Sequence, residues 1–155
     1  MPMDKSILTA SASKLNKVSA AALEEYLKKA DLLVSKVNSL MIERQDIEKL
    51  IGEDNLTMMK DNHANHVRFM ASIFKNPNPE VFIETVLWVF RAYRNHGFKT
   101  NYWAAQMNTW FLVLKESLSE ESYQEIFPYY EWIQINIPLF VELSNQAPGT
   151  QNSLH

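Results

Sequence analysis

Two histidines are the residues whose type and spacing first suggest chemistry. His63 and His66 lie three positions apart, and side chains at this spacing project to the same side of a helix. Imidazole binds iron, zinc and copper, so the pair could supply half of a tetrahedral metal site or an axial haem ligand. Alternatively, both rings lie at the edge of the core and hydrogen-bond to neighbouring helices. No HExxH motif and no third ligand accompany them, so both interpretations stay open.

Positive charges gather at the end of the apolar segment 79–96. Arg91, Arg94 and His96 are followed by Lys99, and cations near a helix C-terminus interact favourably with the helix dipole. An arginine also binds a carboxylate through two parallel hydrogen bonds. We therefore predict that Arg91, Arg94 and His96 bind an anionic group, with helix capping as the alternative.

Aromatic and methionine side chains are dense in the second half of the sequence. Tyrosine and tryptophan combine an apolar ring with a polar group, and methionine fills irregular apolar spaces. Such a set suits a ligand pocket between helices or a dimer surface, as well as an ordinary core. The predicted ligand pocket consists of His63, His66, Met70, Trp88, Phe90, Tyr93, Trp103, Met107 and Trp110.

The motifs of common enzymes are absent from the sequence. With Cys 0 and Gly 3, a cysteine nucleophile, a disulfide and a glycine-rich phosphate loop are all excluded. The absence of cysteine also fits a reducing cytoplasm, where we place the protein. The net charge of -3, without a basic block, offers no surface for nucleic acid. We therefore predict a protein that is not an enzyme and does not bind nucleic acid.

Apolar residues recur every three or four positions over most of the sequence, which indicates helices. We predict helical segments over 19–51, 55–75, 79–96, 100–118 and 119–144, forming an all-α bundle of five to seven helices. The segment 79–96 is apolar on nearly all sides and is predicted to be central. Gly52 and Gly97 are predicted to end helices. The predicted N-caps are Ser19, Asn55, Asn78, Thr100 and Ser119.

The chain length of 155 residues fits one domain. We expect a flexible segment over 1–18, a single helical domain over 19–144 and a flexible tail over 145–155. Pro128 and Pro138 fall inside the last helical pattern and are predicted to kink or split it. The most apolar run, 81–90, is interrupted by Glu84 and has about half of the roughly 20 residues that span a bilayer, so no membrane partner is expected.

The stretch from Tyr93 to Trp103, Tyr-Arg-Asn-His-Gly-Phe-Lys-Thr-Asn-Tyr-Trp, resembles sensor globins, the haem-binding or haem-free globin domains of bacterial signalling proteins. The resemblance covers roughly residues 55–144 and implies a globin-like bundle with a sensory function. Tyr93 stands where the family's haem-ligating histidine belongs, and His96 takes the apolar position before Gly97. The chain therefore looks more like the haem-free members, some of which accommodate a fatty-acid-like ligand.

Together, these features predict a small soluble sensory or regulatory module with a globin-like fold. It would bind an apolar or anionic small ligand, fatty-acid-like or haem, and form a homo-oligomer or contact a signalling partner protein. The ligand would shift the arrangement of the last two helices, with Pro128 and Pro138 as hinges. Two alternatives stay open: a haem or metal protein that uses His66, His63 or Tyr93, and a ligandless helical module that binds a partner protein through its aromatic face.

Overall fold

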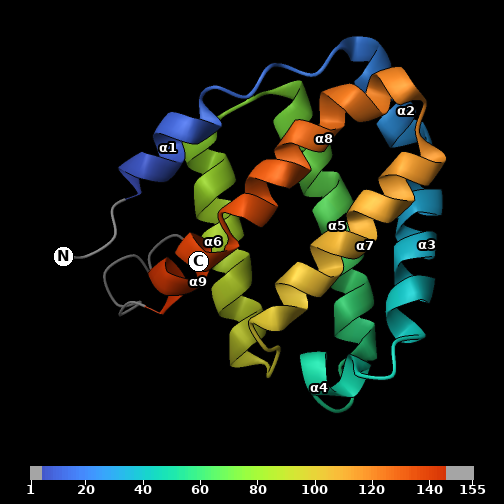
Figure 1. Cartoon of the computed structure of the whole chain (residues 1–155), viewed down its shortest axis with the longest axis vertical. Helices are drawn as coiled ribbons and strands as arrows, with labels where there is room; N and C mark the ends of the chain where they lie inside the picture. The colour runs from blue at the N-terminus through green and yellow to red at the C-terminus, as the bar shows by residue number, and fades with distance from the viewer. Residues whose placement is uncertain (1–4, 146–155) are drawn as a thin grey trace.

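Helices account for all the regular secondary structure between residues 5 and 145, the part of the chain described by the computed structural model (Figure 1). The predicted all-α class is confirmed, whereas the predicted tail beyond Asn145 lies outside the described residues. No helix within 5–145 combines the length and apolar composition needed to cross a membrane. The helices are α1 (Ser6–Ala12), α2 (Ala20–Lys28), α3 (Ala30–Ile42), α4 (Ile47–Ile51), α5 (Leu56–Lys75), α6 (Pro79–Asn95), α7 (Asn101–Ser117), α8 (Glu120–Ile135) and α9 (Ile137–Ser144).

Side-chain caps fix three of the helix starts. Ser19, Asn78 and Ser119 each accept a hydrogen bond from the backbone N–H three residues later, as predicted. Thr100 and Asn55 make no such bond, so the prediction for these two residues was wrong. The backbone of Thr100 is already helical, with φ -63° and ψ -31°, whereas an N-cap that accepts through its side chain normally has an extended backbone.

The described chain has nine helices rather than five to seven, in part because two predicted helices are interrupted. At Lys29 the backbone leaves the helical region, with φ -97° and ψ 4°, and separates α2 from α3. The Lys29 ammonium donates a hydrogen bond of 2.6 Å to the carbonyl of Ser117. Asn136 separates α8 from α9, and Pro138 lies in the first turn of α9. In contrast, α8 continues through Pro128, so the chain is split only near the second proline.

The core is built from large aromatic side chains on α2, α7 and α8. Trp110, Tyr26 and Tyr130 are each 0% exposed. The two tyrosine hydroxyls lie 2.6 Å apart and satisfy each other, as buried tyrosines require. α3 packs against α5 and α7, and α2 packs against α5 and α8. The Trp110 ring contacts His63 and His66 on α5 and Tyr130 on α8, so it lies where α5, α7 and α8 meet.

α6 lies at one side of the bundle, flanked by α1 and α9 (Figure 1). The prediction that this helix is central was wrong, because Val81 is 49% and Trp88 42% exposed. Its apolar faces are covered by two short helices and by contacts such as that of Phe90, whose ring stacks on Trp103 at 4.4 Å. The number of apolar residues around a helix shows that its faces are covered, but not whether short neighbouring helices or a surrounding core covers them.

Residues 5–18, expected to be flexible, contain α1 and pack against the rest of the domain. Leu8 is 0% exposed. The indole N–H of Trp132 donates to Ser11 Oγ at 2.8 Å, and the Tyr129 hydroxyl donates to the carbonyl of Asn16 at 2.7 Å. The buried aromatic groups of α8 need polar partners, and this N-terminal segment supplies them.

Two glycine turns meet where α4 leads into α5 and where α6 leads into α7. Gly52 has φ 90° and Gly97 has φ 99°, so both predicted helix ends are confirmed with the left-handed backbone that favours glycine. The side-chain amide of Asn55 donates to the carbonyl of Ile51 at 2.7 Å and to that of His96 at 2.9 Å. One amide thus joins the start of α5 to the end of α6.

Replacing Asn55 by Asp should lower the free energy of unfolding by about 2–3 kcal/mol, because a carboxylate cannot donate to either carbonyl. Urea denaturation followed by circular dichroism measures this difference. Asn76→Asp is the control, since Asn76 is an exposed residue at the end of α5 and should change the stability little. Equal stabilities of the two variants would contradict a structural role for the Asn55 amide.

Candidate ligand-binding site

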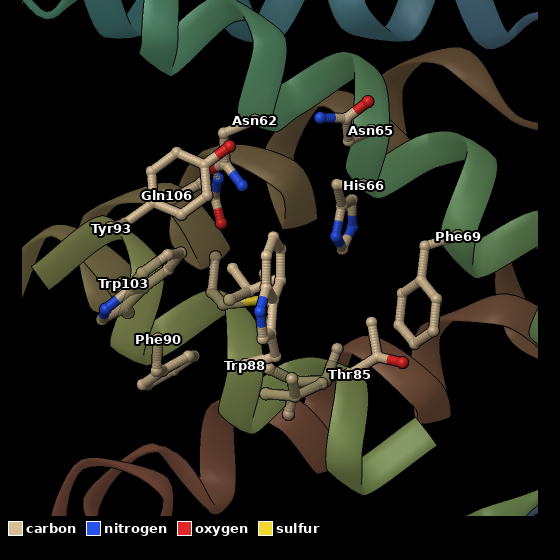
Figure 2. Close-up of a pocket in the computed structure, with 14 residues that line it drawn as sticks. Asn62, Asn65, His66, Phe69, Thr85, Trp88, Phe90, Tyr93, Trp103 and Gln106 are labelled. Carbon is tan, nitrogen blue, oxygen red and sulfur yellow. Dashed lines mark hydrogen bonds between the residues drawn. The ribbon is translucent and has the colours of Figure 1, made fainter. Parts of the chain in front are cut away.

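A cavity of about 200 Å³ lies between α5, α6 and α7, with one contribution from α8 (Figure 2). Its walls are mainly apolar and aromatic, with polar groups contributed largely by α5. The lining residues are Asn62, Asn65, His66 and Phe69 on α5, Thr85, Val86, Trp88, Val89, Phe90 and Tyr93 on α6, Trp103, Gln106 and Met107 on α7, and Ile133 on α8.

The cavity brings together most of the residues predicted to form a pocket. His66, Trp88, Phe90, Tyr93, Trp103 and Met107 all line it. The structure places His63, Met70 and Trp110 in the core instead, where each is 0% exposed. These three side chains face other helices, so helical spacing alone did not separate cavity residues from core residues.

Two polar lining residues of α5, Asn62 and Asn65, were not identified from the sequence. Asn62, Asn65, His66 and Phe69 follow the i, i+3, i+4, i+7 spacing of one helix face. The residues of this helix predicted to line a pocket were His63, His66 and Met70, of which only His66 lies on the cavity face. The mixed polar and aromatic spacing of Asn62, Asn65, His66 and Phe69 is the sequence signal that could have indicated the cavity face of α5.

Aromatic rings form the wall opposite α5 (Figure 2). Phe90 and Trp103 stack with ring centroids 4.4 Å apart and an interplanar angle of 10°. Tyr93 meets Trp103 edge-on at 6.0 Å, and such arrangements are favourable for aromatic pairs. Trp88 is 42% exposed and lines the cavity as well, so its indole lies between the cavity and the surface.

A buried hydrogen-bond network lies behind the polar wall. The Tyr102 hydroxyl donates to Asn62 Oδ1 at 2.8 Å, and Gln106 Nε2 donates to the same oxygen and to the Tyr102 hydroxyl. His63 Nε2 lies 3.2 Å from the Tyr102 hydroxyl, and His63 Nδ1 lies 2.6 Å from Asn38 Oδ1. The network connects α3, α5 and α7 and fixes the orientation of Asn62 and Gln106 in the cavity wall.

The two histidines have different surroundings, which bears on the predicted metal site. Both ring nitrogens of His63 lie within hydrogen-bond distance of protein groups, so this ring has no free nitrogen for a metal shared with His66. Within residues 5–145 there is no group of three His, Cys, Asp or Glu side chains that could hold a metal ion. The geometry therefore favours the alternative of a core histidine for His63.

His66 presents a polar atom that the described protein groups leave without a partner. Its Nε2 is buried and has no hydrogen-bond partner, and the ring projects from α5 into the cavity (Figure 2). The ring lies between Trp110 and Tyr130, at centroid distances of 4.8 and 5.2 Å. Burial, together with the nearby His63, lowers the pKa of His66 to about 3, so the imidazole is neutral at pH 7. A neutral imidazole nitrogen can form one further hydrogen bond.

The residues present do not fit haem. The cavity of about 200 Å³ is smaller than the roughly 300–1,000 Å³ of sites that hold drug-sized ligands, and the haem macrocycle is large even on that scale. Tyr93, at the position where the resemblance expects the iron ligand, has its pKa raised by burial. Its hydroxyl is therefore protonated and a poor metal ligand at pH 7.

The cations predicted to bind an anion lie outside the cavity lining. Arg94 Nη1 donates to the carbonyl of Ser144 at 2.9 Å, and Arg91 Nη2 donates to that of Leu143 at 3.3 Å. Both arginines thus hold the C-terminal carbonyls of α9, where positive charge is favourable. His96 is exposed at the end of α6. No Asp, Glu, Lys or Arg lines the cavity.

Exposed apolar side chains do not single out a partner surface. Leu27 on α2, Leu112 on α7 and Ile135 on α8 are each more than half exposed, and others are spread over α1, α3, α5 and α6. Scattered exposed apolar residues are normal for soluble domains. Oligomerisation and a signalling partner therefore stay predictions from the sequence.

The fold and site define the class of the protein as an all-α domain with a small, uncharged cavity. No protein-family model, curated protein or solved structure matches this chain. The resemblance to sensor globins stays a prediction from the sequence.

Proposed function

We propose that this protein is a small sensory or regulatory module that binds an apolar small molecule between α5, α6 and α7. The observation that carries the proposal is a cavity of about 200 Å³ with no Asp, Glu, Lys or Arg in its lining and one buried, unpartnered nitrogen, His66 Nε2. A cavity of about 150 Å³ lined by apolar residues is known to bind benzene. The resemblance of the segment from Tyr93 to Trp103 to sensor globins supports a globin-like arrangement and a sensory role.

α6 connects the cavity to the C-terminal helix. Val89 and Tyr93 on α6 line the cavity, whereas Arg91 and Arg94 on the same helix bind the last carbonyls of α9. A ligand that shifts α6 would therefore also change how α9 is held. Such a ligand acts only through its different affinity for the two arrangements. The helix break at Asn136, next to Pro138, is the hinge that this mechanism uses.

Filling the cavity should prevent binding. We expect Val89→Phe to weaken the binding of apolar ligands at least tenfold, because the added ring atoms occupy the ligand volume. Val81→Phe is the matched control, since Val81 lies on the same helix, is 49% exposed and does not line the cavity. The measurement is NMR titration of the tryptophan indole N–H signals with benzene, indole, decanoate and haem, each at pH 7.

The possible outcomes separate the site from the function. Equal weakening in the two valine variants would place the ligand elsewhere on the protein. Stoichiometric haem binding with a Soret band would contradict a small-ligand cavity. Absence of binding of benzene, indole and decanoate to the wild-type protein would overturn the proposed function.

A further inference from the structure

We infer that the cavity selects an uncharged, single-ring aromatic molecule that carries one hydroxyl group, with this hydroxyl hydrogen-bonded to His66 Nε2. The inference rests on the proposed function and names the class of ligand for that site. It combines three observations: the volume of the cavity, its flat aromatic wall and a buried nitrogen without a partner on a lining residue, His66 Nε2.

The size and shape of the cavity favour one aromatic ring. About 200 Å³ is somewhat more than the roughly 150 Å³ of a cavity that holds benzene, which leaves room for a small substituent. The stacked pair of Phe90 and Trp103, inclined by only 10°, and the indole of Trp88 present aromatic surfaces to the cavity (Figure 2). Aromatic rings gain from offset-stacked or edge-on contact with other rings, so a planar ring gains more here than an alkyl chain.

The position of the polar substituent follows from the bonds already made in the wall. Asn62 Oδ1 accepts hydrogen bonds from Tyr102 and Gln106, and Asn65 is exposed and accepts a hydrogen bond from Arg68. Among the lining residues, His66 has a buried nitrogen, Nε2, that no protein group hydrogen-bonds; Trp110 Nε1 also has no partner but does not line the cavity. An unsatisfied buried polar atom costs stability, so a ligand that pairs with it gains affinity.

The chemistry of a neutral imidazole determines which substituent fits. Depending on the tautomer, Nε2 either donates or accepts one hydrogen bond, and a hydroxyl group can serve as the partner of either form. A carboxylate can only accept, and it would lose its hydration without a cation in the cavity lining. An ammonium group would likewise find no carboxylate there. An uncharged hydroxyl is therefore favoured over both charged groups.

Phenol, benzene and benzoate are probes of matched ring size that test this inference. Dissociation constants at pH 7, measured by NMR titration for the wild-type protein and for His66→Phe, give the preference for phenol over benzene in each protein. We expect the preference to fall about tenfold in His66→Phe, because the ring is kept but the hydrogen bond is lost. His66→Gln, which can donate and accept, should retain part of the preference. Benzoate should bind wild type at least tenfold more weakly than phenol.

The results distinguish failure of the inference from failure of the proposed function. If benzene and phenol bind but their ratio is the same in wild type and both His66 variants, the role of His66 is overturned while the cavity remains a ligand site. Benzoate binding as tight as phenol binding would overturn the selection for uncharged ligands. If none of the three probes binds the wild-type protein, the inference is overturned. If indole and decanoate also fail to bind, the proposed function is overturned as well. If His66→Phe does not fold, wild type is compared with His66→Gln. A preference for phenol over benzene that falls by half or less in His66→Gln supports the inference.

Discussion

Lowering the pH from 7 to 5 is expected to reduce the free energy of unfolding by about 4 kcal/mol, with about 2 kcal/mol from each of His63 and His66. Burial lowers the pKa of both rings from 6.5 to about 3. Below pH 6.5 the unfolded chain therefore binds protons that the folded protein does not bind. The stability is fully present above pH 6.5 and decreases continuously as the pH falls towards 3.

The surroundings of the two rings explain the size of this effect. His63 contacts Asn38 and Tyr102, and His66 contacts Trp110 and Tyr130, none of which carries a charge to stabilise an imidazolium. Carboxylates with lowered pKa values change the free energy of unfolding over a different, more acidic pH range. The pKa of Glu25 is lowered to about 2 by hydrogen bonds from Lys29 and serine groups, so its contribution is lost only below pH 4.5.

Urea denaturation at pH 7, 6 and 5 measures the loss of stability. His66→Phe should remove about half of the pH dependence, because one of the two buried titrating groups is gone. His96→Gln is the control, since His96 is exposed at the end of α6, and its pH dependence should match that of wild type. The explanation is wrong if wild type and His66→Phe lose the same stability between pH 7 and 5.

Trp110→Ala is expected to lower the free energy of unfolding by about 3–5 kcal/mol, the typical cost of removing a buried aromatic side chain. Trp110 is 0% exposed, and its ring contacts those of His63, His66 and Tyr130. The deletion leaves a void among α5, α7 and α8 that these surrounding rings cannot fill without leaving their own contacts.

Trp88→Ala provides a control with the same change of side chain. Trp88 is 42% exposed, so we expect a loss of about 1 kcal/mol or less. Both variants are compared with wild type by urea denaturation at pH 7, where the buried histidines are neutral. Similar losses in the two variants would show that Trp110 is not a central residue of the core.

Local sequence features predicted much of the secondary structure. Ser19, Asn78 and Ser119 cap helices as expected, and Gly52 and Gly97 follow helix ends with positive φ. These features depend on a few neighbouring residues, which is why they are visible in the sequence. The capping prediction for Asn55 was wrong: no backbone N–H of α5 donates to its side chain, and its NH2 group instead donates to two carbonyls, one of which belongs to His96, 41 residues away.

The candidate site was predicted less completely than the helices. The aromatic density of α6 and α7 indicated Trp88, Phe90 and Trp103, all of which line the cavity. Asn62 and Gln106 were not indicated, because polar residues on a helix are usually solvated and their burial here depends on Tyr102. Arg91 and Arg94 were predicted to bind an anion, but the end of α9 lies against them.

By itself, the sequence determined that the chain is helical, where several of its helices begin and end, and that His63 and His66 share one side of a helix. Only the tertiary structure decided what each histidine does. His63 is fixed by Asn38 on α3 and Tyr102 on α7, whereas the ring of His66, one turn later, projects into the cavity and has a nitrogen, Nε2, without a hydrogen-bond partner (Figure 2). Helical periodicity is a local property, but the partners of a buried polar group come from distant parts of the chain and are set by how the helices pack.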